Sequence, residues 1–325
     1  MKKMNKGLRT VLVFAGIVLL FVLWVLLTGG TENYRAKYAG IDLATDVQGI
    51  GRANTYTHYL ENHADAAYPK EAVEIDVTGV AAAENVEIYA LEDGAPAVRT
   101  GDDSSAAWTV NVPEAGFYNI QIEYLTVSSR GVDIERRLEI NGESPFAGAE
   151  TLLFSRLWAD GCEVRKDNQG NDIRPTQVEV FAWQTAYCRD AMGYVVEPYR
   201  FYFDAGESTV AFIAVNEPMI VRAVRLTPVM DEPLYADYRA AQPEKPMSDG
   251  ARNYVQIVQG EDSFLRSSPS LYARYDRSSP VTVPMSITNT ILNYSGGDPW
   301  NIPGQWIEWV VDAPEDGYYH LSVKA

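Results

Sequence analysis

One phrase occurs twice in this chain. Trp108-Thr-Val-Asn-Val-Pro-Glu-Ala-Gly-Phe-Tyr, which continues to Tyr124, returns as Trp309-Val-Val-Asp-Ala-Pro-Glu-Asp-Gly-Tyr-Tyr, which continues to Ala325. Each copy predicts a strand, a Pro-Glu-x-Gly turn and a second strand whose apolar residues alternate. The copies are too widely spaced for a solenoid, whose repeats span roughly 20–50 residues. They predict two related β domains in tandem, the second cut off inside a strand.

Short alternating segments separated by turn residues fill residues 67–229. Examples are Val73 to Val77, Phe117 to Leu125 and Thr209 to Val215. Asn141-Gly142 predicts a tight turn, because both positions tolerate positive φ. Since no long helical pattern interrupts these segments, we expect an all-β protein built as an antiparallel β-sandwich.

The chain divides into five predicted parts. Residues 1–31 form a signal anchor or transmembrane helix, and 32–66 form a juxtamembrane segment with a short helix. Residues 67–229 form one complete β-sandwich. A proline-containing linker follows at 230–252, with a helical turn at Tyr235 to Ala241, and 253–325 form a second, truncated β-sandwich.

The N-terminus has the pattern of an export signal. Lys2, Lys3, Lys6 and Arg9 precede an uncharged apolar run from Val11 to Leu27, which orients the N-terminus toward the cytoplasm. This run is longer than a typical signal-peptide core, so we favour an uncleaved anchor that crosses the membrane through residues 11–27. Cleavage near Thr28-Gly29-Gly30 is the alternative. The rest of the chain then lies at the extracellular face of the cell membrane.

Charge and motif content exclude several functions. The formal net charge of −17 repels phosphate backbones, so nucleic acid is not an expected partner. No Gly-x-Ser-x-Gly elbow and no phosphate-binding glycine loop are present. The histidines lack metal-ligand spacing with a cysteine partner. We therefore expect no enzymatic activity.

The two cysteines allow a disulfide. Cys162 and Cys188 bracket an irregular stretch that contains Asp167-Asn-Gln-Gly-Asn-Asp172. A cysteine pair in an exported domain favours a bridge, which would contribute about 3 kcal/mol through loop entropy. Two free thiols are the alternative, because sequence alone does not fix connectivity.

Three phrases of the first domain resemble those of a known family. Val-Pro-Glu-Ala-Gly-Phe-Tyr at 112–118, Leu-Glu-Ile-Asn-Gly at 138–142 and Ala-Gly-Glu-Ser-Thr-Val at 205–210 occur in that order, followed by Val-Arg-Ala-Val-Arg-Leu at 221–226. The domain resembles the galactose-binding-like carbohydrate-binding modules attached to polysaccharide-degrading enzymes, which implies a jelly-roll sandwich. The whole layout resembles the N-terminal end of large extracellular solute-binding proteins of carbohydrate ABC importers.

The resemblance also implies a structural calcium in many family members. Glu74 and Asp76 stand where first-strand acids would bind the ion, but Arg222 occupies the closing-strand position, where an aspartate is expected. An arginine there would instead pair with one of those acids. We therefore expect no cofactor and leave the metal ligands unassigned.

Sugar recognition by such modules uses aromatic rings that stack on pyranose faces, together with a few polar side chains. The insertion between Phe154 and Tyr194 contains such groups. The candidate carbohydrate-binding residues are Trp158, Trp183, Tyr187, Arg189, Asp190 and Tyr194. The alternative for each ring is packing of the insertion onto the sandwich. Trp108 and Trp309 lie on alternating strands and are expected in the core.

The leading functional hypothesis is a non-catalytic, carbohydrate-binding component of a sugar importer, with permease subunits as further partners. Accessory modules of a secreted glycoside hydrolase are one alternative, and a structural or adhesion module is another. The resemblance places the importer's binding body beyond residue 325. The sequence does not identify the sugar.

Overall fold

The computed structural model describes residues 14–20, 54–91, 94–230, 233–242 and 254–324. The chain forms two units, Met1–Arg52 and Ala53–Ala325. Within the first unit only residues 14–20 are described, and they are helical. The remainder of the predicted membrane segment 11–27 lies outside the described residues. Among the helices that are described, none has the length and apolarity needed to cross a membrane.

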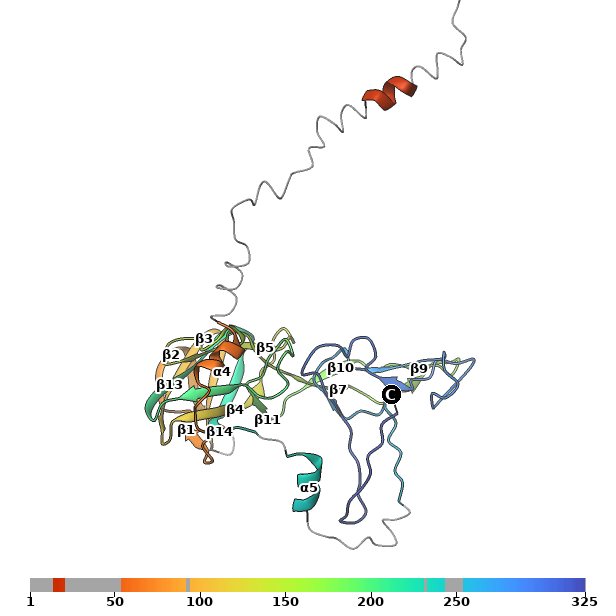
Figure 1. Ribbon diagram of the computed structural model, residues 1–325. Coiled ribbons are helices and arrows are strands. Elements are labelled where there is room, and N and C mark those ends of the chain that lie inside the picture. The colour runs from red at the N-terminus through yellow and green to blue at the C-terminus, as the bar shows by residue number, and fades with distance from the viewer. Residues whose placement is uncertain (1–13, 21–53, 92–93, 231–232, 243–253, 325) are drawn as a thin grey trace, which may run out of the picture. The chain divides into compact units, whose positions relative to one another are not determined.

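The second unit contains an antiparallel β-sandwich, as the alternating pattern predicts (Figure 1). One arm of its continuous sheet has the order β2–β3–β13–β5–β6, and the other contains β1, β14 and β4, with β11 and β12 both paired to β4. The arms join where the start of β14 pairs with β3. The bounds are β1 Val73–Ile75, β2 Val80–Ala90, β3 Pro96–Val112, β4 Gly116–Thr126, β5 Ile134–Ile140, β6 Leu152–Phe154, β11 Gln184–Tyr187, β12 Arg200–Phe203, β13 Gly206–Asn216 and β14 Met219–Pro228.

The core lies between the two arms. Trp108 is fully buried, as predicted, and its indole N–H donates to the Val77 carbonyl at 2.8 Å. On β4, alternate residues from Tyr118 to Tyr124 enter the core. The predicted tight turn at Asn141-Gly142 is confirmed, since both residues have positive φ and Ile140 and Glu143 exchange backbone hydrogen bonds.

The Pro-Glu-x-Gly turn carries the chain from one arm to the other. β3 pairs with β2, β13 and β14, whereas β4 pairs with β11, β12 and β14. The turn is closed by the Tyr118 hydroxyl, which donates to the Glu114 carbonyl at 2.8 Å. Gly116 is required for close packing, because a Cβ atom there would lie 2.5 Å from the Ala67 carbonyl oxygen.

Helix α4, Tyr56–Asn62, packs against this sandwich within the segment where a short helix is expected. The Thr55 side chain caps its first turn by accepting from the His58 amide at 3.2 Å. A 3₁₀ turn, η1, spans Ala147–Glu150. The predicted helical turn in the linker is confirmed as α5, Tyr235–Ala241.

The insertion after β6 forms a second sheet together with the C-terminal residues. Its strands are ordered β10–β7–β15–β18, and β8 pairs separately with β9. β16 and β17 form a further two-stranded ladder. The bounds are β7 Leu157–Asp160, β8 Arg165–Lys166, β9 Asp172–Ile173, β10 Gln177–Val180, β15 Leu265–Arg266, β16 Ala273–Arg274, β17 Tyr294–Ser295 and β18 Ile307–Glu308.

The second copy of the repeated phrase keeps local features of the first. The Tyr319 hydroxyl donates to the Glu315 carbonyl at 2.7 Å, which reproduces the bond that closes the first turn. Trp309 is half-buried rather than in a core, and its indole N–H donates to the Gly260 carbonyl at 3.1 Å. Through residue 324, neither arm of this second turn forms a strand. In the first copy the arms pair with β13 and β14, whereas residues 254–324, as far as the structure describes them, form no corresponding hairpin.

The predicted disulfide is wrong. Cys162 and Cys188 are both free thiols. Cys188 is buried in the sandwich core, where its amide donates to the Ile120 carbonyl, whereas Cys162 is exposed in the turn after β7. Burial raises the pKa of the Cys188 thiol, so this cysteine behaves as an apolar core residue.

Candidate functional site

One outer sheet surface combines aromatic and polar side chains. Because residues along a strand alternate between faces, Gln121 and Glu123 of β4 point away from the core that their neighbours enter. The register places Arg225 of β14 and Tyr187 of β11 on opposite sides of Gln121. Glu74 of β1 lies opposite Arg225. These residues form one row across four strands.

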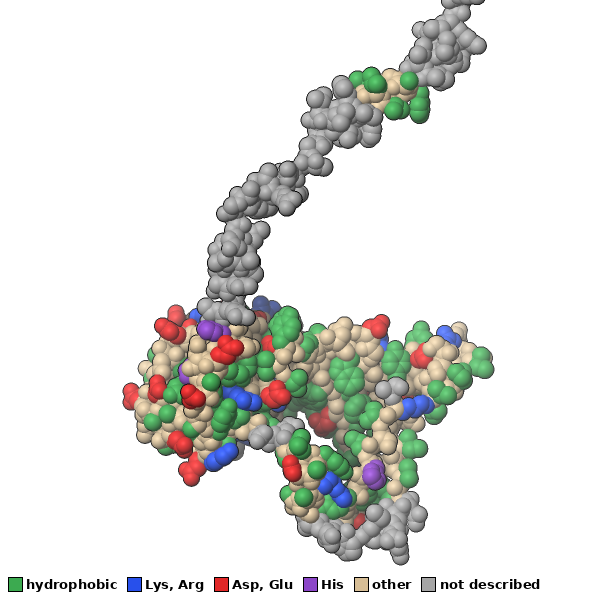
Figure 2. All heavy atoms as spheres, viewed as in Figure 1, with side chains coloured by type: hydrophobic (Ala, Val, Ile, Leu, Met, Phe, Trp, Pro, Cys, Tyr) green, Lys and Arg blue, Asp and Glu red, His purple; other side chains and the backbone are tan. Residues whose placement is uncertain are grey.

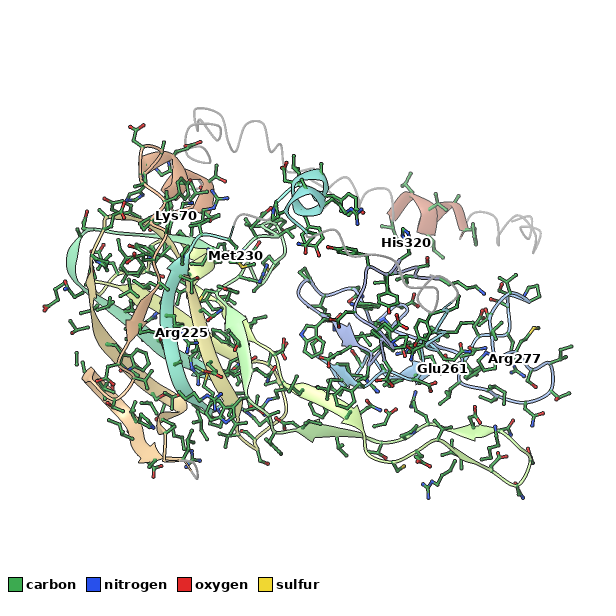
Figure 3. All side chains as sticks on the ribbon, turned by 90° about the horizontal axis from the view of Figure 1, so that it is seen from below. Lys70, Arg225, Met230, Glu261, Arg277 and His320 are labelled. Carbon is green, nitrogen blue, oxygen red and sulfur yellow. The ribbon has the colours of Figure 1, made fainter. Side chains whose placement is uncertain are left out.

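A second group lies beside this row. Thr185 is opposite Glu123, and a register shift between Val221 and Ala223 lets Arg222 reach the same carboxylate. We call the combined surface the β4 face. It comprises Glu74, Gln121, Glu123, Trp183, Thr185, Tyr187, Arg222 and Arg225. Figure 3 labels Arg225 on β14, in the middle of the sandwich.

Ion pairs fix the polar groups of the β4 face. The Arg225 Nε donates to both Glu74 carboxylate oxygens, at 2.7 and 2.9 Å. The Arg222 Nη2 donates to Glu123 at 2.5 Å, and this hydrogen bond holds the pKa of Glu123 below its ordinary value. Partly exposed pairs contribute little to stability. Their effect here is to hold planar donors and acceptors in set positions.

Two aromatic rings lie on this face. The Arg222 guanidinium lies 4.3 Å from the centre of the Trp183 ring, which fixes the ring's orientation. Tyr187 lies four residues further along an extended segment, so its Cα is about 13 Å from that of Trp183. Both side chains are half-buried. Two partly exposed rings beside fixed polar groups suit stacking on a pyranose ring and hydrogen bonding to its hydroxyls.

The structure assigns Arg189, Asp190 and Tyr194 to a neighbouring loop rather than to the β4 face. This loop leaves the sheet after Cys188 and returns at Tyr199, whose amide donates to the Cys188 carbonyl. The Arg189 guanidinium donates to the Val196 carbonyl at 2.6 Å. The Tyr194 side chain is 85% exposed, so it packs against almost nothing.

Asp190 braces that loop. Its carboxylate accepts from the backbone amides of Met192, Tyr194 and Val195 at 3.0, 2.6 and 3.1 Å. Burial opposes ionisation, but these hydrogen bonds outweigh it, so the pKa of Asp190 lies below its ordinary value. A carboxylate that accepts from three backbone amides of one loop stabilises the conformation of that loop.

Trp158 belongs to the second sheet. It lies on β7, opposite Glu179 and Arg266, and its ring covers Gly131 of the β4–β5 loop. Of the six predicted residues, the structure therefore brings only Trp183 and Tyr187 together on one surface.

The two first-strand acids that the resemblance links to calcium make internal contacts. Glu74 is bound by Arg225, while Asp76 accepts from the Thr78 amide and hydroxyl at 2.9 and 2.7 Å. Arg222 pairs with Glu123 instead of with either first-strand acid. Within the described ranges, no three His, Cys, Asp or Glu side chains gather as a metal-binding group.

Sequence reasoning missed the polar half of the β4 face. Alternation along β4 places Gln121 and Glu123 on the outer side, but it does not distinguish them from any other solvent-facing pair. The missing information was the strand order, which brings Glu74 and Arg225 beside them from opposite ends of the domain.

Comparisons with known proteins identify similar solved structures only. No protein-family model matches the chain, and no curated protein does so either. A family 35 carbohydrate-binding module from Clostridium thermocellum is 12% identical, with 49% of this chain and 99% of that chain covered and a TM-score of 0.29. The family 6 module of a marine laminarinase from Zobellia galactanivorans is 15% identical, with coverage of 48% and 99% and a TM-score of 0.28.

A family 35 module from Cellvibrio japonicus is 13% identical over 49% of this chain and 95% of its own, with a TM-score of 0.30. No family is assigned on this basis. Identities and TM-scores at this level do not transfer a ligand from these modules to this chain.

Proposed function

We propose that this chain is an exported, non-catalytic carbohydrate-binding protein whose β4 face binds a neutral saccharide. The observation that carries the proposal is the pairing of Trp183 and Tyr187 with a row of fixed polar side chains on one sheet surface. The rings supply apolar stacking area. Gln121, Glu123 and the two arginines supply hydrogen bonds to sugar hydroxyls.

Three further observations support this proposal. Sequence phrases of the first domain resemble those of galactose-binding-like modules, and the fold is an antiparallel sandwich. The N-terminal basic and apolar pattern predicts export. Acidic side chains are spread over the visible surface of the sandwich (Figure 2), which disfavours polyanionic partners such as nucleic acid.

At a finer level, we propose that the chain serves a carbohydrate ABC importer at the extracellular face of the membrane and contacts its permease subunits. The rival functions are an accessory module of a secreted glycoside hydrolase and an adhesion module. Sequencing of the complete gene tests this choice. A two-lobed α/β binding fold supports the importer, whereas a catalytic barrel with paired carboxylates supports the hydrolase.

The β4 face is tested by substitution of its rings. We expect Trp183→Ala and Tyr187→Ala each to weaken binding of a glycan selected on a glycan array by about five- to tenfold, because one stacking platform is lost. Isothermal titration of the full chain in detergent measures the change. Tyr194→Ala is the matched control, since it removes an exposed ring from the neighbouring loop and should leave affinity unchanged. Equal losses in all three variants, or no glycan binding by the parent, refute the proposal.

A further inference from the structure

A second concave site lies away from the β4 face, between the insertion and the C-terminal residues. Its cavity has a volume of about 430 Å³ and is lined in part by Asp172, Arg174, Arg274, Tyr275, Thr290 and Tyr294. Asp172 belongs to β9 of the insertion, while Arg274 and Tyr294 face one another across the β16–β17 ladder. None of these residues contributes to the β4 face.

Hydrogen bonds between the two segments hold this cavity in shape. The Asp172 carboxylate accepts a hydrogen bond from the Leu292 amide at 2.9 Å, and the Asp172 amide donates to the Thr290 carbonyl at 2.8 Å. The Asn171 side chain accepts from the Thr290 amide at 2.9 Å. The turn at 167–172 therefore connects the insertion to the C-terminal residues.

The cavity presents two cationic side chains. The guanidinium carbons of Arg174 and Arg274 lie 3.9 and 4.4 Å from the centre of the same ring, that of Tyr272. Within the part of the chain that the structure describes, neither arginine has an acidic side chain within salt-bridge distance, and the Arg274 Nε is buried without a hydrogen-bond acceptor. A buried donor without an acceptor calls for a ligand or water in this position.

The nearby acids do not neutralise these arginines. Asp172 is already paired with the Lys166 ammonium at 2.6 Å. Glu261 lies in the same C-terminal part of the chain (Figure 3). Burial raises its pKa, and the charges of Asp262 and Asp172 raise it further, so its ionised form is disfavoured. The charged side chains of the cavity lining are therefore two arginines and one aspartate, and that aspartate is paired with Lys166 outside the lining.

We propose that this cavity binds an acidic sugar residue, with the sugar carboxylate at Arg174 and Arg274 and the ring against Tyr275 and Tyr294. Guanidinium groups bind carboxylates through strong, charge-assisted hydrogen bonds. Two tyrosines beside them supply apolar area and hydroxyls for a polar ring of modest size. The saccharide nature of the ligand rests on the proposed function, but the site and its charge preference are separate from the β4 face.

Titration of the full chain with D-glucuronate, methyl glucoside and inorganic sulfate tests the proposal. We expect glucuronate to bind, methyl glucoside to bind at least tenfold more weakly, and added salt to weaken glucuronate binding. Arg274→Gln and Arg174→Gln should each reduce glucuronate affinity by about tenfold or more, and Arg274→Lys should retain part of it. Circular dichroism confirms that each variant is folded.

Trp183→Ala separates this site from the β4 face. It should leave glucuronate binding unchanged while weakening the neutral glycan selected on the array, so the two proposals fail independently. Equal binding of glucuronate and methyl glucoside overturns the acidic-sugar assignment. Sulfate binding as strong as that of glucuronate shows a general anion site and also overturns it. Unchanged glucuronate affinity in both glutamine variants places the ligand elsewhere.

Discussion

At the scale of single residues, Glu217 connects three segments of the sandwich. It lies in the β13–β14 turn with φ +57 and is fully buried. Its carboxylate accepts from the Arg130 Nε at 2.7 Å and from the Arg156 Nη2. Arg156 also donates to the Val132 and Val127 carbonyls at 2.6 and 3.0 Å. One carboxylate thus ties the hairpin to the β4–β5 loop and to the start of the insertion.

Loss of this carboxylate should change how the free energy of unfolding depends on pH. Burial opposes ionisation of Glu217, but the hydrogen bond from Arg130 and the charges of Arg156 and Arg130 outweigh it, so its pKa lies below the ordinary value. A lowered pKa stabilises the fold above about pH 4.3, the unfolded value, and this contribution is lost as pH falls through the folded pKa. Glu217→Gln should lower the free energy of unfolding by about 3 kcal/mol at pH 7.

Urea unfolding at pH 7, 4 and 3 measures this effect. The difference between parent and Glu217→Gln should shrink toward pH 3, while the exposed control Glu71→Gln should match the parent throughout. A difference that stays constant with pH contradicts the role of the ionised carboxylate.

At the scale of elements, α4 completes the edge strand β12. The Tyr56 and Tyr59 hydroxyls accept from the backbone amides of Arg200 and Tyr202 at 2.9 and 2.7 Å. The rings of Tyr59 and His63 also contact Phe117 and Tyr202. Side chains of a helix therefore satisfy strand amides that would otherwise lack a partner.

Tyr59→Phe isolates one of these bonds. It leaves the Tyr202 amide without an acceptor, so we expect a loss of about 1–3 kcal/mol in unfolding free energy. Burial raises the pKa of Tyr59 to about 12, so ionisation of this buried hydroxyl should destabilise the parent, but not Tyr59→Phe, as pH rises from about 10 through that value. Denaturant unfolding at neutral and alkaline pH tests both statements, with Tyr238→Phe on α5 as the control. Equal stability of the two variants contradicts the role of the Tyr59 hydroxyl.

Sequence patterns predicted the positions of strands and helices better than they predicted which side chains pair across strands. Alternation identified the strands at Val73, Phe117 and Thr209, and a short helix was expected in the segment that contains α4. The pairing of Arg222 with Glu123, and of Arg225 with Glu74, depends on a strand order that no local pattern contains. Glu217 gave no signal, because its burial results from arginines that reach it from distant loops. The cysteine prediction failed because spacing does not reveal that Cys188 points into a core.

At the scale of the whole molecule, the two copies of the repeated phrase differ in what covers them. Ile120 and Ile122 of the first copy are 0% exposed, whereas their counterparts Leu321 and Val323 are 88% and 81% exposed. The local turn is the same in both copies, but only the first has β13 and β14 over its apolar side chains. Burial in this fold is therefore a property of the assembled sandwich and not of the phrase.

Matched substitutions test that difference. Ile120→Asp should abolish cooperative folding of the sandwich, because an unpaired charge would enter the core. Leu321→Asp should change the unfolding free energy by less than about 0.5 kcal/mol. Thermal unfolding followed by circular dichroism separates the two outcomes. A large loss in Leu321→Asp would show that the second copy is packed in solution.

The late position of β13 and β14 in the chain sets the order in which the domain can assemble. β13 pairs with β3 and β5, and β14 pairs with β1, β3 and β4. A nascent chain that ends at Ala205 therefore has the β2–β3 and β4–β12 ladders, but it lacks the strands that join β3 to β5 and β1 to β4. Such long-range pairing folds slowly and leaves open edges in the meantime. If the chain is exported as proposed, the residues next to the apolar segment cross the membrane first, so those edges stay exposed until residue 228 has crossed.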